Sequence, residues 1–146
     1  MTLENFNTRL LSITDHRRIC GPASDKHISL IEQYLENEGG FVLPKGYYQM
    51  LQNINGFVFS DFNFYSCLPS PPELVLNVID ENEQWRNEID EANGYFFIGD
   101  DSSYFYCIRL ENTSYCRLGK EDFELESDFE SLEDMLDEIS IVFRYN

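Results

Sequence analysis

The sequence predicts an α+β fold, in which a mainly antiparallel sheet is packed by helices, as a single domain over residues 1–146. Three observations support this prediction. In the first fifty residues, apolar residues recur every three or four positions, which is typical of helices. Between residues 57 and 127, short aromatic runs are separated by turns, and strands joined by short turns are antiparallel. The chain then closes with a second helical pattern, and its length is that of one domain.

The first half of the chain predicts three helices. The segment 1–23 holds an N-terminal helix over residues 2–13, with its apolar residues on one side. Ser24 is a good N-cap for the second helix, which should stop at the glycines of "EGG". Pro44 suits the first turn of the third helix, and Gly56 should be the left-handed residue that closes it.

Aromatic and β-branched runs predict the strands. Residues 57–68 alternate as a strand does, with a turn near Asp61 or Asn63. Three further strands with short connections are expected at 94–99, 104–110 and 114–119, and a short edge strand at 122–127.

Two further helices are expected in the second half. Residues 73–91 favour a helix that the polar "DENEQ" can interrupt. The closing helix should begin near Phe129, with Ser127 or Asp128 as its cap.

Charge is the strongest signal in the composition. The chain carries 27 acidic and 10 basic residues, a net charge of −17. Residues 73–146 hold 20 acids and 5 bases, which is −15 of that total. Such a field repels nucleic acid and anionic lipid and accelerates encounters with basic partners, although acidic surfaces also serve solubility alone. We therefore expect no nucleic-acid partner and no membrane partner.

The location and redox state follow from what the sequence lacks. Polar residues interrupt the N-terminal segment, so it does not read as a signal peptide, and no apolar run is long enough to span a membrane. A cytoplasmic protein is expected. The four cysteines form no CxxC pair, and buried thiols are expected, with two of them, Cys107 and Cys116, on strands that could pair.

The stretch "FIGDDSSYFYCI" at 97–108 contains two adjacent acids, Asp100 and Asp101. Adjacent side chains on a strand point apart, and the spacing does not fit a calcium loop, although a magnesium site completed by a distant carboxylate stays open. Asp and Ser favour turns, so we predict a strand, a turn with exposed aspartates, and a strand. His16 and His27 lie in polar stretches, and no common catalytic motif is present. We expect no enzyme, no metal and no cofactor.

Several stretches together resemble a known family. "ISLIEQYLENEGGFVLPKGYYQMLQNINGF" is followed by a segment with Trp85, by "FFIGDDSSYFYCIRL" and by a closing helix of "FESLEDML" type. Over roughly residues 28–140 this resembles the SUKH superfamily, which includes the yeast Smi/Knr-like regulators, and it looks closest to the bacterial YrhA-type immunity proteins. The sequence departs from its relatives in having Ser102 and Ser103 where they usually have glycine.

The resemblance implies an α+β binding protein without catalytic residues. Bacterial members of the family are regarded as immunity proteins that neutralise polymorphic or contact-dependent toxins, often nucleases. We expect a cationic toxin domain as the partner. The candidate contacts, chosen by clustering of charge together with the sole tryptophan, are Asp80, Glu81, Glu83, Trp85, Asp100, Asp101, Glu121 and Asp122.

Two other functions stay open. One is a regulatory or scaffold module that binds a protein with no toxic activity, as the yeast members suggest. The other is a metal-dependent hydrolase that uses clustered carboxylates. Trp85 itself suits either the core or an interface.

Overall fold

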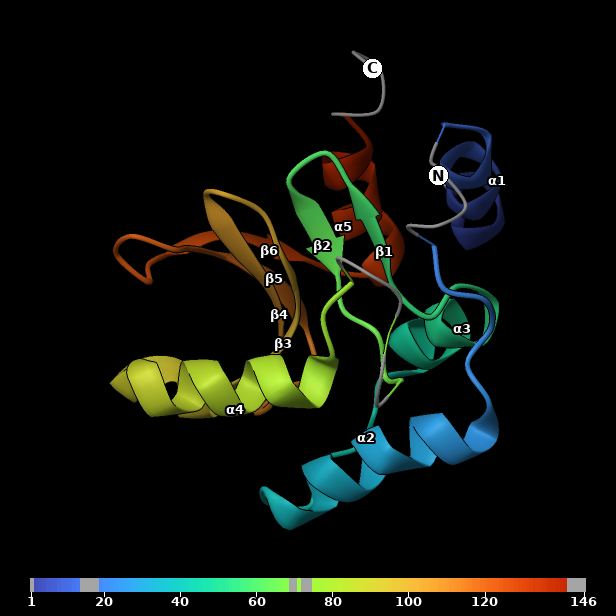
Figure 1. The fold of residues 1–146 in the computed structure, drawn as a ribbon. Helices are drawn as coiled ribbons and strands as arrows, with labels where there is room; N and C mark the ends of the chain where they lie inside the picture. The colour runs from blue at the N-terminus through green and yellow to red at the C-terminus, as the bar shows by residue number, and fades with distance from the viewer. Residues whose placement is uncertain (1, 14–18, 69–70, 72–74, 142–146) are drawn as a thin grey trace.

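The computed structural model describes residues 2–13, 19–68, 71 and 75–141 (Figure 1). These residues form an α+β structure, as predicted. Its elements, in chain order, are α1 (Leu3–Ile13), α2 (Asp25–Asn37), α3 (Lys45–Asn53), β1 (Phe57–Phe59), β2 (Phe62–Phe64), α4 (Val78–Glu88), a short 3-10 helix (Asp90–Gly94), β3 (Tyr95–Asp100), β4 (Tyr104–Arg109), β5 (Tyr115–Gly119), β6 (Leu125–Phe129) and α5 (Leu132–Ser140).

Short polar side chains cap three of the helices. Ser24 accepts a hydrogen bond from the backbone N–H of His27 at the start of α2, as its sequence predicts. Asn77 caps α4 in the same way. Helix α4 runs without a break through "DENEQ", so the predicted interruption is wrong. Residues 75–77, which were predicted to be helical, lie before the helix begins. Ser131 caps α5, where Ser127 or Asp128 was expected, because residues 125–129 belong to a strand instead.

The sheet is a six-stranded antiparallel meander in the order β1-β2-β3-β4-β5-β6. The predicted break in residues 57–68 falls at Ser60 and Asp61, between β1 and β2. The three central strands lie where the sequence placed them. The edge strand β6 begins later than predicted, because a turn first folds Phe123 back over the sheet, where its ring lies 5.6 Å from that of Tyr95.

Two groups of helices cover opposite faces of the sheet. Phe96 and Phe97 are neighbours on β3, so their side chains point to opposite faces. Phe96 packs against Tyr47 of α3. Phe97 packs against Phe105, whose ring in turn lies 4.9 Å from Trp85 of α4. Helix α4 therefore covers the face opposite α3, and Figure 1 shows α4 lying apart from α3 and α5.

Gly56 has the left-handed conformation that the sequence predicts, with φ of +94°. It lies two residues beyond Ile54, the C-cap of α3, and leads directly into β1. A Cβ at this position would come within 2.9 Å of the carbonyl oxygen of Phe64 and the nitrogen of Ser66. Both the backbone angle and the close approach of β2 therefore require glycine here.

All four cysteines are buried free thiols, as expected. Cys107 and Cys116 lie directly opposite each other on β4 and β5. Within the described ranges, no helix has the length and apolar character needed to cross a membrane. His16 lies outside the described residues.

Candidate functional site

The candidate contacts fall on three segments that are far apart in the chain. The first segment is α4, which carries Asp80, Glu81, Glu83 and Trp85. The second is the end of β3 with the turn that follows it, and the third is the turn between β5 and β6. The contacts that join these segments centre on Asp100 and Lys120.

Asp100 is buried, with 8% of its surface exposed, so the prediction that both aspartates of this turn are exposed is wrong. Strand β3 continues through Asp100, which lies opposite Asn63 on one side and Phe105 on the other. Its Oδ2 accepts a 2.6 Å hydrogen bond from the hydroxyl of Tyr65 and lies 3.5 Å from Nζ of Lys120. Removal from water raises the pKa of the Asp100 carboxyl, and the bond from Tyr65 and the charge of Lys120 oppose that rise.

Asp101 organises the turn between β3 and β4. Its Oδ1 accepts the backbone N–H groups of Ser103 and Tyr104, each at 2.8 Å. Its Oδ2 accepts the hydroxyl of Tyr106 at 2.8 Å. These bonds between Asp101 and the backbone of the next residues confirm the predicted turn. The side chain of Asp101 is only partly exposed to solvent.

Ser102 and Ser103 fit this turn without backbone strain. Neither Ser102 nor Ser103 has a positive φ. Ser102 instead donates its N–H and its hydroxyl to Oδ2 of Asp61, at 3.1 and 2.5 Å. These bonds lower the pKa of the Asp61 carboxyl, the hydroxyl bond being the largest cause. Ser102 therefore ties the β3–β4 turn to the β1–β2 turn.

Glu81 and Asp100 share one cation. Burial raises the pKa of the half-buried Glu81 carboxyl, and repulsion from Asp100 raises it further, while Lys120 lowers it. Lys120 also lies over two rings, with Nζ 5.4 Å from the centre of Phe105 and 6.0 Å from that of Trp85. Lys120 thus pairs with Asp100 and acts on Glu81 only through its charge, which leaves this cluster of three groups net negative when both carboxyls are ionised.

Trp85 belongs partly to the core and partly to the surface. Its ring packs edge-on against Phe105 at 4.9 Å, and it joins the main hydrophobic cluster while remaining only half-buried. An aromatic side chain in this position offers a partner an apolar contact next to charged groups.

The other candidate contacts are exposed, and three of them adjoin Glu81 or follow Lys120 in the sequence. Asp80 lies in the first turn of α4 beside Glu81. Glu121 and Asp122 follow Lys120 in the β5–β6 turn. Glu83 is different, because it interacts with Tyr34 of α2, so the structure does not bring it into the cluster.

Sequence reasoning missed Tyr65 and Lys120, the two residues that hold Asp100. Tyr65 carries no signal, because it reads as one more aromatic residue in a strand. Lys120 does carry one, since it is the sole basic residue between Arg117 and Arg144 in a strongly acidic stretch.

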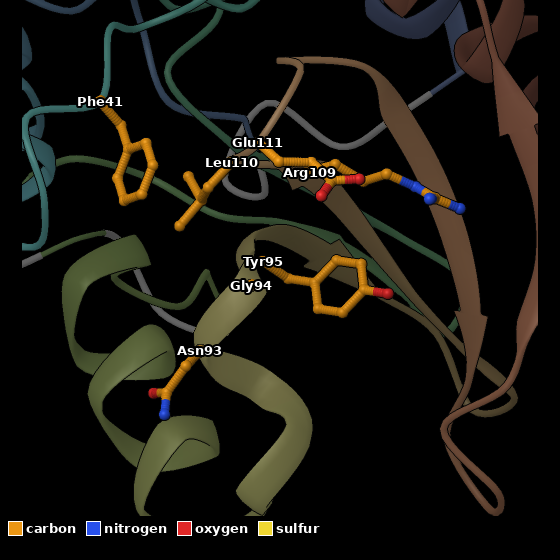
Figure 2. Close-up of a pocket in the computed structure, with 7 residues that line it drawn as sticks. All are labelled: Phe41, Asn93, Gly94, Tyr95, Arg109, Leu110 and Glu111. Atoms are coloured by element: carbon orange, nitrogen blue, oxygen red, sulfur yellow. The ribbon is translucent and has the colours of Figure 1, made fainter.

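A separate pocket of about 270 Å³ lies at the other end of the β3–β4 hairpin (Figure 2). Figure 2 shows Phe41 and Leu110 extending into the space between them, while the side chains of Tyr95 and Arg109 extend toward the far strands. The full lining is Phe41, Asn93, Gly94, Tyr95, Arg109, Leu110 and Glu111. The pocket is smaller than most small-molecule sites, which start near 300 Å³.

Metal sites and nucleophilic sites each require particular side chains close together. In residues 2–13, 19–68, 71 and 75–141, no group of three His, Cys, Asp or Glu side chains is placed to hold a metal ion. Ser24 Oγ lies 2.9 Å from Nδ1 of His27, but this contact belongs to the cap of α2, where the same oxygen accepts the His27 N–H.

The sequence matches a known protein family over most of its length. The family described as SMI1 / KNR4 family (SUKH-1) matches residues 22–138, about four-fifths of the chain. The resemblance to the SUKH superfamily is thereby confirmed, and the closeness to the YrhA-type branch stays a prediction. The search of curated proteins gave no match.

Proposed function

The chain belongs to the SMI1/KNR4 family (SUKH-1), and from this premise we propose that it is a non-enzymatic immunity protein. It binds and neutralises a polymorphic or contact-dependent bacterial toxin in the cytoplasm, and the toxin class that its charge favours is a nuclease. Family membership is compatible with this role. The observation that carries the choice of partner is the acidic surface built by α4 and the two turns beside it.

The charge argument depends on what a nuclease must expose. An enzyme that acts on nucleic acid presents Lys and Arg to the phosphates. Residues 73–146 of this chain carry a net charge of −15, and they include both turns and α4. Such a surface competes for the phosphate-binding site and accelerates association with it.

The exposed acids and Trp85 have different parts in this interface. Asp80, Glu121 and Asp122 are exposed and available to the cations of a partner. Trp85 lies beside them as a partly exposed aromatic anchor, the residue type that contributes most at protein interfaces. Asp100 is buried and pairs with Lys120, and the half-buried Glu81 adds a further carboxyl beside the exposed acids of α4.

Co-expression tests the proposal. The C-terminal domain of whichever protein the neighbouring gene encodes is expressed in a host cell, with and without the chain. Restored growth and copurification of the two proteins are expected. A toxic neighbour that kills equally in the presence of the chain would contradict the proposal. A harmless neighbour would favour the regulatory module instead.

A further inference from the structure

Strand β6 forms the outer edge of the sheet. It pairs with β5 on one side, and it is the last strand in the order. Helix α5 follows β6 in the chain and contacts it. Within the described ranges, however, no backbone hydrogen bond reaches the outer side of residues 125–129. An open edge of this kind presents N–H and C=O groups that can pair with another strand.

The register shows which backbone groups face outward. The N–H of Gly119 on β5 donates to the carbonyl oxygen of Glu124, at 2.9 Å, so it faces the β6 side. Backbone direction alternates along a strand, so the N–H of Arg117 also faces β6, where Arg117 lies opposite Ser127. Asp128 is the next residue of β6. Its own N–H and C=O therefore point away from β5, to the open edge.

The side chains along this edge are acidic. Glu126 and Asp128 on β6, with Glu124 before it and Glu130 after it, are all exposed. The alternation of side chains is interrupted at Glu126 by a bulge, since Ser127 lies opposite Arg117 and Leu125 opposite Leu118. Asp128 lies 3.0 Å from Arg109. For the other three, the described part of the chain provides no ion-pair partner. Leu125 lies among them with 48% of its surface exposed, an apolar contact on an otherwise charged edge.

We propose that β6 binds an extended basic segment of the partner protein as a seventh strand of the sheet. Backbone bonds to groups such as those of Asp128 would supply affinity, and the exposed acids along this edge would select lysine and arginine. A second copy of this chain is a poor occupant, because pairing β6 with itself sets acids opposite acids. The proposal rests on the proposed function in one respect, which is that the partner is a cationic protein.

The proposal is tested by adding a synthetic peptide and measuring hydrogen exchange of the backbone amide of Asp128. The probe is a synthetic peptide of about nine residues that alternates lysine with valine, a minimal basic strand. At saturating peptide, hydrogen exchange of the Asp128 amide should slow by about tenfold or more, because that N–H becomes bonded. A peptide that binds without protecting this amide, or that fails to bind at low salt, overturns the proposal.

Two substitutions of the same residue separate backbone pairing from charge. Asp128→Pro removes the outward N–H and keeps the bonds to β5, since proline is tolerated on the outer side of an edge strand. Asp128→Asn removes the same charge and keeps the N–H. We expect Asp128→Pro to bind the peptide about tenfold more weakly than Asp128→Asn. Equal binding by the two variants overturns the proposal.

A third variant and the growth assay complete the test. Glu126→Lys with Glu130→Lys leaves the backbone intact and should also lose the peptide, whereas undiminished binding overturns the selection of basic residues. The co-expression assay tests the proposed function independently of peptide binding at β6. Full rescue by Asp128→Pro would overturn the edge proposal and leave the immunity role standing, while failure of the unaltered chain to rescue would overturn the immunity role.

Discussion

The hydroxyl of Tyr65 donates a 2.6 Å hydrogen bond to Oδ2 of Asp100, which joins the segment after β2 to the end of β3 inside the protein. Tyr65→Phe should lower the free energy of unfolding by about 1–3 kcal/mol, because the buried carboxylate loses a donor. Denaturant unfolding measures this change. Tyr106→Phe, which removes a bond to the less buried Asp101, is the matched control and should cost less.

Asp100→Asn should change how stability depends on pH. Burial raises the pKa of Asp100 in the folded protein above its ordinary value of 3.8, so the folded protein binds a proton more readily than the unfolded chain. As the pH rises above 3.8, the unaltered protein should therefore lose stability relative to Asp100→Asn. One proton sets the limit of this effect at about 1.4 kcal/mol per pH unit. Unfolding titrations at several pH values measure it.

Asp61→Asn should change the dependence of stability on pH in the opposite direction. The bonds from Ser102 lower the pKa of Asp61, so its carboxylate contributes stability above pH 3.8 that is lost as the pH falls through its lowered value. The unaltered protein should thus gain stability relative to Asp61→Asn as the pH rises. Parallel trends in the two variants would contradict the burial and bonding described for these carboxyls.

Gly56→Ala should destabilise the protein. The new Cβ would require a strained left-handed backbone and would press against β2, and strain of this kind costs about 1–3 kcal/mol. Gly21→Ala is the control, because its Cβ would meet nothing within 4 Å, and it should be near neutral. Thermal or denaturant unfolding compares the two, and equal effects would contradict the close approach at Gly56.

The opposed pair Cys107 and Cys116 should remain reduced. Both thiols are fully buried, and burial is the largest cause that raises the pKa of the Cys107 thiol, which slows its oxidation. A thiol reagent should therefore label all four cysteines after unfolding without reductant, and almost none in the folded protein. Two labelled thiols after unfolding would instead indicate a disulfide across β4 and β5.

Local patterns predicted most of the fold, because spacing and capping act over a few residues. Ser24, the strands of the meander and the left-handed Gly56 all follow from such patterns. The edge strand was misplaced because the packing of Phe123 on Tyr95 is a tertiary contact that residues 121–129 do not reveal. The N-cap of α5 was also predicted at the wrong residue. Ser127 and Asp128 suit a cap as well as Ser131 does, and only the tertiary structure places them in β6.

The candidate site was harder to predict than the fold. Clustering of charge identified the turns and α4 but treated Asp100 and Asp101 alike. Their difference comes from pairing along β3 and from Tyr65, which lies 35 residues earlier in the chain. Asp100 is buried and its neighbour Asp101 is not, because only one of them lies on the sheet face that α4 covers. The sequence alone does not show which face this helix covers.

The association rate between this chain and the proposed toxin partner tests the acidic surface most directly. Asp80→Lys with Glu121→Lys reverses two exposed acids of the candidate site. Glu32→Lys with Glu36→Lys reverses two exposed acids of α2 and is the matched control, since both variants change the net charge equally. The rates are compared at about 50 and 500 mM salt, where screening lengths differ severalfold. The account predicts a rate that falls steeply with salt and that falls much further in the first variant than in the second. A rate that is unchanged by salt and equal in the two variants would contradict it.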